Sequence, residues 1–190
     1  MPKATCLPKR CCWVRVAKIL DRTDAVEYLL GRLTRPVHDH TQPQILSPED
    51  SAFWRQAYLD AFVDTSGDHY RRYIASPRQF SDGVHYEGYI WDCLRSPLRI
   101  TIQRFRHEVV VHPEVFVMAD DHSRDRIPGA PLWPYPPYSV ARFEPQRLLE
   151  SLDSLPEDIY VFDSSVSWTL VLTHEDDGRR RICCAVGIET

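Results

Sequence analysis

The chain has 190 residues, of which 43% are hydrophobic and 26% charged, and its formal net charge is −4. These are ordinary values for a folded globular protein and exclude a wholly disordered chain. No run of about 18 apolar residues occurs, so no membrane-spanning helix is predicted.

Charge is spread unevenly along the sequence. Residues 1–36 carry eight basic and three acidic side chains, a local charge of +5, which leaves −9 for residues 37–190. An acidic body is a poor general binder of nucleic acid and a suitable binder of a cationic protein. The 20 arginines against 3 lysines indicate a GC-rich, bacterial genome.

The N-terminus and the cysteines bear on the cellular compartment. Residues 1–12 carry basic side chains but are not followed by the apolar stretch of about 7 residues that a secretory signal needs. The six cysteines form no CxxC pair and no Cys/His quartet of zinc-finger spacing. We therefore expect reduced thiols in a cytosolic protein.

The first helices divide the chain into two regions. Residues 13–33 have apolar side chains at loosely helical spacing, and residues 38–44 have the composition of a linker. We expect a basic helical extension and linker over residues 1–44 and one domain over residues 45–190. That domain begins with a helix, because Ser47 is a suitable N-cap, Pro48 suits the first helical position and an apolar, aromatic stripe follows. A short helix is predicted to end before Pro77.

Strand signals dominate the rest of the chain. We predict a strand over residues 86–94, a helix over 101–110 and a buried strand over 115–118. A proline-rich loop then leads to a strand at 139–142, a short helix at 146–152 and a strand at 159–162. Because helices gather early and strands late, the sequence predicts an α+β fold with a mainly antiparallel sheet.

A C-terminal β-hairpin is the clearest predicted unit. Residues 168–175 and 179–186 flank Asp177-Gly178, a pair typical of two-residue hairpin turns. Such a turn pairs residues whose numbers sum to 355, so Leu172 should face Cys183 and Glu175 should face Arg180. Both faces of the hairpin are apolar near its base, which predicts an interior position in the sheet.

Acidic side chains follow the predicted strand over residues 115–118. Asp120, Asp121, His122 and Asp125 carry atoms that a divalent metal accepts as ligands, and His174 could join them if a loop folds over the hairpin end. Neighbouring residues on an extended chain point to opposite faces, however, so Asp120 and Asp121 cannot both bind one metal from a regular strand. The other interpretation is a strand end followed by an Asp/Ser-rich turn.

Two further segments have a chemical interpretation. Trp133, Tyr135 and Tyr138 lie in a proline-rich loop that could contact a partner or cover the protein's own core. Cys93 and Arg99 have the spacing of a cysteine-phosphatase loop. That loop needs glycine and successive backbone N–H donors, whereas this one has no glycine and Pro97 removes a donor, so we do not expect phosphatase activity.

The sequence contains no catalytic motif, so we expect a small cytosolic protein-binding domain rather than an enzyme. Its sharpest form is an immunity- or antitoxin-type inhibitor of a cationic protein, with Asp120, Asp121, Asp125 and the aromatic loop as the contact residues. No cofactor is expected in this case. The alternative is a metal-assisted hydrolase in which Asp120, Asp121, His122 and His174 bind a divalent metal.

Overall fold

The computed structural model describes residues 42–76, 78–81, 86–120, 131–176 and 181–188. They all belong to one compact unit, His40–Thr190. The helices predicted over residues 13–33 lie outside the described residues. Within the described part of the chain, no helix combines the length and the apolar character needed to cross a membrane.

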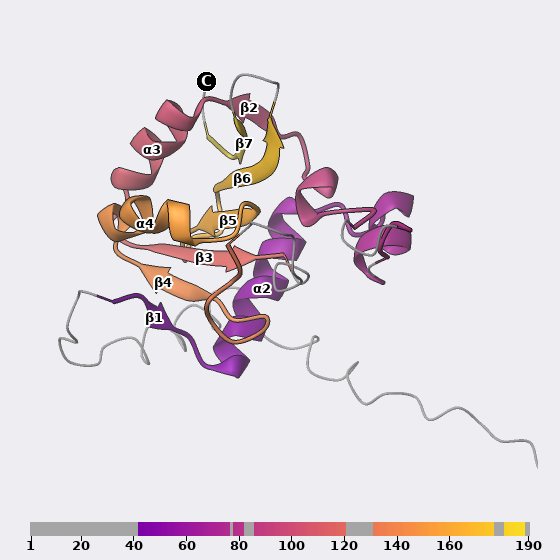
Figure 1. Cartoon of the computed structure of the whole chain (residues 1–190), viewed down its shortest axis with the longest axis horizontal. Coiled ribbons are helices and arrows are strands. Elements are labelled where there is room, and N and C mark those ends of the chain that lie inside the picture. Colours follow the sequence, from indigo (N-terminus) through magenta and orange to yellow (C-terminus); the bar gives the residue numbers. More distant parts are fainter. Residues whose placement is uncertain (1–41, 77, 82–85, 121–130, 177–180, 189–190) are drawn as a thin grey trace, which may run out of the picture. The chain divides into compact units, whose positions relative to one another are not determined.

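A seven-stranded sheet forms the centre of this unit (Figure 1). The strand order is β1-β4-β3-β5-β6-β7-β2, and every neighbouring pair is antiparallel. The α+β fold with a mainly antiparallel sheet is therefore confirmed. The strands are β1 (Gln44–Ile45), β2 (Leu98–Ile100), β3 (Val115–Ala119), β4 (Ala141–Phe143), β5 (Ile159–Phe162), β6 (Thr169–Asp176) and β7 (Arg181–Val186).

In the described residues, three α-helices begin at side-chain caps. They are α2 (Pro48–Phe62), α3 (Ile102–Val110) and α4 (Pro145–Ser151). The Ser47 hydroxyl accepts a hydrogen bond from the Asp50 amide at 3.1 Å, and Thr101 caps α3 in the same way. Shorter helical segments are η2 (Tyr70–Ile74), η3 (Ile90–Cys93) and η4 (Leu152–Ser154). The helices predicted after Ser47, over residues 101–110 and near 146–152 are confirmed.

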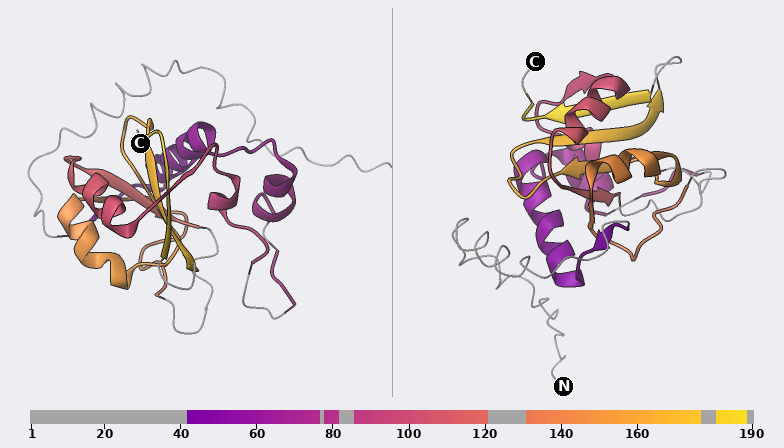
Figure 2. Two further views of the ribbon diagram at one scale, coloured as in Figure 1. Left: turned by 90° about the horizontal axis from the view of Figure 1, so that it is seen from above. Right: turned by 90° about the vertical axis from the view of Figure 1, so that its left-hand side faces the viewer.

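The helices cover both faces of the sheet, α2 on one face and α3 with α4 on the other (Figure 2). Alternation along β3 serves both layers, because Val115 and Val117 pack with α3 and α4 while Phe116 contacts Trp54 of α2. The α2 face is rich in rings, and Tyr58 packs against Phe62, Tyr160 and Phe162. The sheet is therefore buried on both sides and gives a rigid base for the segments at its edges.

The prediction of a strand over residues 86–94 was wrong. The backbone of Tyr86 forms an isolated bridge with Gln79 and belongs to no strand, and Ile90–Cys93 forms the helical turn η3. One cause is local, because the Asp92 carboxylate accepts a hydrogen bond from the Tyr89 amide at 2.8 Å and so stabilises the turn. The aromatic residues of the segment are therefore not part of the sheet and lie at one end of it, beside the start of β5.

The hairpin has the predicted register at its base and a different one near its turn. Leu172 pairs with Cys183, as expected, but Asp176 pairs with Arg181. Four residues of β6 therefore span the same length as two residues of β7, so β6 contains a bulge between Leu172 and Asp176. The predicted Glu175–Arg180 pair cannot be compared with this register, because Arg180 lies outside the described residues. His174 lies within the bulge.

Candidate functional site

A carboxylate–imidazole pair is built on the β6 bulge. Asp158 directly precedes β5 and is only 6% exposed. Its two carboxylate oxygens each lie 3.0 Å from Nδ1 of His174, and Oδ1 also accepts a hydrogen bond from the His174 backbone amide at 3.0 Å. The hydrogen bond to Asp158 raises the pKa of His174, and partial burial of the ring opposes this shift. The imidazole is therefore held in one orientation, with Nδ1 on the carboxylate.

The η3 segment adds an aromatic wall beside this pair. The Trp91 indole Nε1 donates a hydrogen bond to Asp158 Oδ1 at 3.1 Å, which ties η3 to the start of β5. The rings of Tyr89 and Trp91 are stacked, with centroids 5.6 Å apart and an interplanar angle of 17°. The Tyr89 ring centroid lies 4.6 Å from that of His174. Three rings from two distant segments thus gather at one end of the sheet.

A second imidazole approaches from the segment that precedes η2. His69 Nε2 lies 3.5 Å from the Asp92 carboxylate. Gly88 permits this approach, since a Cβ atom at that position would lie 2.8 Å from Tyr73 Cβ and 3.1 Å from His69 Nε2. The glycine therefore allows η2 and His69 to pack directly against the segment that leads into η3.

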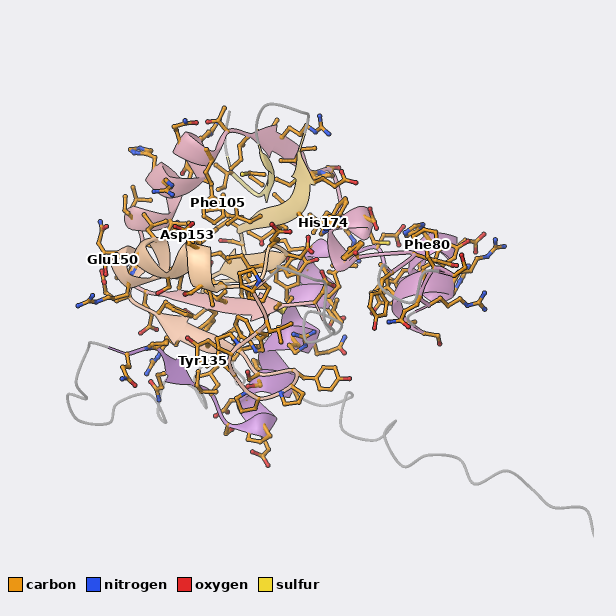
Figure 3. All side chains as sticks on the ribbon, in the orientation of Figure 1. Phe80, Phe105, Tyr135, Glu150, Asp153 and His174 are labelled. Carbon is orange, nitrogen blue, oxygen red and sulfur yellow. The ribbon has the colours of Figure 1, made fainter. Side chains whose placement is uncertain are left out.

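A pocket of about 610 Å³ lies beside these groups, and its lining includes His69, Tyr89, Trp91, Asp92 and His174. His174 and Phe80 lie on the same side of the sheet in Figure 3 and both belong to the lining. The described lining residues include three carboxylates, two imidazoles and several aromatic rings, and no lysine or arginine: His69, Phe80, Ser81, Tyr86, Glu87, Tyr89, Trp91, Asp92, His174 and Glu175. The pocket is therefore both acidic and aromatic.

The titration of Tyr89 reports the electrostatic potential of this pocket. Burial is the main cause that raises the Tyr89 pKa to about 12, and the charges of Asp158, Asp120, Asp92 and Glu175 raise it further. Four carboxylates thus disfavour a negative charge at the phenol oxygen. Near neutral pH, where the Asp120 carboxyl group with its pKa of about 8 is mainly protonated, the charges of Asp158, Asp92 and Glu175 still favour a positively charged ligand.

Asp120, which the sequence predicts for a binding or metal site, is a buried side chain. It is 5% exposed, and its carboxylate accepts hydrogen bonds from the Tyr160 hydroxyl at 2.5 Å and the Ile90 amide at 3.2 Å. Burial, followed by the charge of Asp158, raises its pKa to about 8. Asp120 joins the end of β3 to η3 and does not line the pocket.

The other residues of the predicted metal cluster cannot be placed beside it. Asp121, His122 and Asp125 lie outside the described residues. Within the described ranges, no group of three or more His, Cys, Asp or Glu side chains is arranged to hold a metal ion. Of the four predicted ligands, His174 and Asp120 are described, and only His174 lines the pocket.

The aromatic loop divides between core and surface. Trp133 is 5% exposed, and its Nε1 donates a hydrogen bond to the Ser139 hydroxyl at 3.0 Å. The Tyr135 ring packs against Trp133 and Phe143. Tyr138 is 59% exposed, so it is the residue of the predicted trio that presents most of its ring to solvent.

Cys93 lacks the ionisation that a phosphatase nucleophile needs. Burial and the charges of Asp92 and Asp64 raise its pKa to about 11. A thiol with that pKa carries little thiolate at neutral pH, and the thiolate is the nucleophile. The Cys93 side chain is therefore a buried packing group.

Sequence reasoning identified His174 and missed its partners. The pairing Ile159–Leu172 between β5 and β6 places Asp158 opposite Thr173, next to His174. Both strands were predicted, and aligning them across the six residues between β5 and β6 would have brought Asp158 to this position. The contribution of Tyr89 and Trp91 had no comparable signal, because it depends on η3.

Comparisons with known proteins leave the geometry of the site as the guide to function. No family description, curated protein or solved structure matches the chain.

Proposed function

We propose that this protein is a small cytosolic binding domain that acts by occupying a positively charged protein, as an immunity- or antitoxin-type inhibitor does. The observation that carries the proposal is the pocket beside the β6 bulge. It combines the carboxylates of Glu87, Asp92 and Glu175 with the rings of Tyr89 and Trp91.

The surroundings of the pocket support an interface with a protein. Phe80, on the pocket lining, is 52% exposed. Tyrosine and tryptophan are enriched among the residues that contribute most to protein–protein affinity, in particular where they form pockets for a partner's side chains. The net charge of −9 outside residues 1–36 would accelerate encounter with a basic partner at low ionic strength.

The test is affinity capture from a lysate of the organism that encodes the protein, with washes at low and high salt. The wild type is compared with a Glu87→Gln/Glu175→Gln variant, which removes two pocket charges and leaves the shape of the side chains nearly unchanged. A matched control carries Glu150→Gln and Asp153→Asn, two exposed carboxylates on α4 and η4, away from His174 (Figure 3).

We expect one stoichiometric basic protein that the wild type and the control retain at low salt and that the pocket variant loses. A captured protein that all three variants retain equally would contradict the assignment of the pocket. The absence of any stoichiometric basic protein would contradict the proposed function itself.

A metal-assisted hydrolase is the second candidate, favoured by one observation. Histidines that bind metals through one ring nitrogen commonly have the other nitrogen on a carboxylate, as His174 has with Asp158. The metal content of the captured wild-type protein tests this candidate. About one equivalent of a divalent metal, lost in a His174→Gln variant, would support it over the binding domain.

A further inference from the structure

We infer that the group which enters the pocket is the side chain of an arginine of the partner. This inference rests on the proposed function and specifies the chemistry of the contact. It follows from the combination of stacked rings, carboxylates and available volume at the end of η3.

The aromatic wall favours a flat cation. Tyr89 is only 7% exposed and its ring contacts those of Trp91 and His174, so the half-buried Trp91, parallel to Tyr89 within 17°, is the ring that offers surface to the pocket. A guanidinium group is planar and weakly hydrated, so it stacks on such rings with little loss of hydration. Arginine is found over aromatic faces more often than lysine, and tryptophan is the most favourable ring.

The carboxylates favour a cation with several donors. Glu87 and Glu175 come from different segments, and Asp92 belongs to η3 and lies 3.5 Å from His69 Nε2. A guanidinium group presents five N–H donors around its edge and can therefore satisfy carboxylates in its own plane while its faces contact rings. An ammonium group is a point charge with three donors and keeps a strong hydration shell, so it gains less from the rings.

Among the described lining residues, the imidazoles of His69 and His174 are the only groups that can carry a positive charge, because none of these residues is a lysine or an arginine. Asp158 accepts hydrogen bonds from Trp91 and His174, whereas Glu175 is exposed. The pocket therefore has negative charge available at its surface, with fixed rings behind it.

The experiment compares three blocked tripeptides of the form acetyl-Gly-X-Gly-amide, in which X is arginine, lysine or citrulline. Citrulline has nearly the shape of arginine and no charge. Binding to the full-length protein is followed by the ¹⁵N–¹H signal of the Trp91 indole, which is assigned with a Trp91→Phe variant, and by calorimetry. The Glu175→Gln variant and the control Glu150→Gln are titrated in parallel.

We expect the arginine peptide to bind at least fivefold more tightly than the lysine peptide and at least tenfold more tightly than the citrulline peptide. Glu175→Gln should weaken arginine binding severalfold, whereas Glu150→Gln should not change it. Equal affinity for arginine and lysine would overturn the arginine inference and leave the binding of cationic partners intact. No shift of the Trp91 signal with any peptide would overturn the inference, and capture of a basic protein would then have to use another surface.

Discussion

The substitution Asp120→Asn tests whether the buried carboxyl group lowers the free energy of unfolding as the pH rises. Asp120 lies under Tyr160 and Ile90 with a pKa of about 8, against about 3.8 for the ordinary side chain. The folded state therefore holds more protons than the unfolded state between about pH 4 and pH 8. The free energy of unfolding must fall as the pH rises through this interval. Asparagine has no such titration.

The magnitude follows from the separation of the two pKa values. Each unit of difference corresponds to about 1.4 kcal/mol. Between pH 5 and pH 7.5 the wild type should lose about 3 kcal/mol of stability at Asp120, after allowing for partial ionisation near the folded pKa. The difference in unfolding free energy between Asp120→Asn and wild type should shift by the same amount in favour of the variant. Asparagine loses a hydrogen bond at any pH, which adds a constant offset.

Urea unfolding of both proteins from pH 5 to pH 8 measures this shift. The raised pKa of His174 also gives stability that is present below its unfolded pKa and lost as the pH rises through its folded value. That contribution is common to both proteins and cancels in the difference. The exposed Asp153→Asn variant serves as a control and should show no pH-dependent difference. A constant difference between Asp120→Asn and wild type over the whole range would refute the buried-acid argument.

Three further predictions concern the pocket, the hairpin and a thiol. The His174 ring faces Tyr89, Trp91 and the carboxylates of Asp158, Glu157 and Glu175, and its protonation adds a positive charge to the pocket. The affinity for the arginine peptide should therefore fall as the pH drops through the raised pKa of His174. In calorimetry, His174→Gln should remove most of this pH dependence. In urea unfolding, Gly187→Ala should lower the free energy of unfolding by about 2 kcal/mol or more, because φ at Gly187 is +75° and the new Cβ would lie 2.1 Å from the Ser167 carbonyl oxygen. The control Gly67→Ala should have a much smaller effect, because its new Cβ would have its nearest contact at 3.3 Å. Cys93 should resist alkylation at pH 8 in the folded protein and react after unfolding, as followed by peptide mass mapping; fast reaction in the folded state would contradict a pKa of about 11.

The parts of the fold that could be predicted are those with local causes. The N-cap Ser47 with Pro48, the continuous apolar run of β3 and the Asp177-Gly178 turn each act over a few residues, and the elements they predict are present. For residues 86–94 the prediction was wrong because a local hydrogen bond and tertiary contacts together determine the conformation. Their aromatic side chains resemble a strand pattern, but Asp92 and the tertiary bonds of Trp91 to Tyr160 and Asp158 hold a helical turn instead.

The candidate site was less predictable than the fold because it depends on a register shift. In a regular hairpin, the numbers of every pair of facing residues in β6 and β7 would sum to 355, and His174 would occupy an ordinary strand position. Because of the bulge after Leu172, the backbone amide and the ring of His174 both reach the carboxylate of Asp158. The sequence from Leu172 to Asp176 contains no feature that predicts this shift in register. It is a consequence of how the hairpin meets Asp158.

Asp158 also determines how mutations around the pocket should combine. One oxygen of this residue, Oδ1, receives the Trp91 indole, the His174 amide and the His174 ring. Loss of any one donor changes the charge density that the others share, so the effects of substitutions at Trp91 and His174 should not add. Sequence change in this region is therefore expected to be concerted. Tryptophan, histidine and aspartate at these positions should be kept or replaced together, even though they lie up to 83 residues apart along the chain.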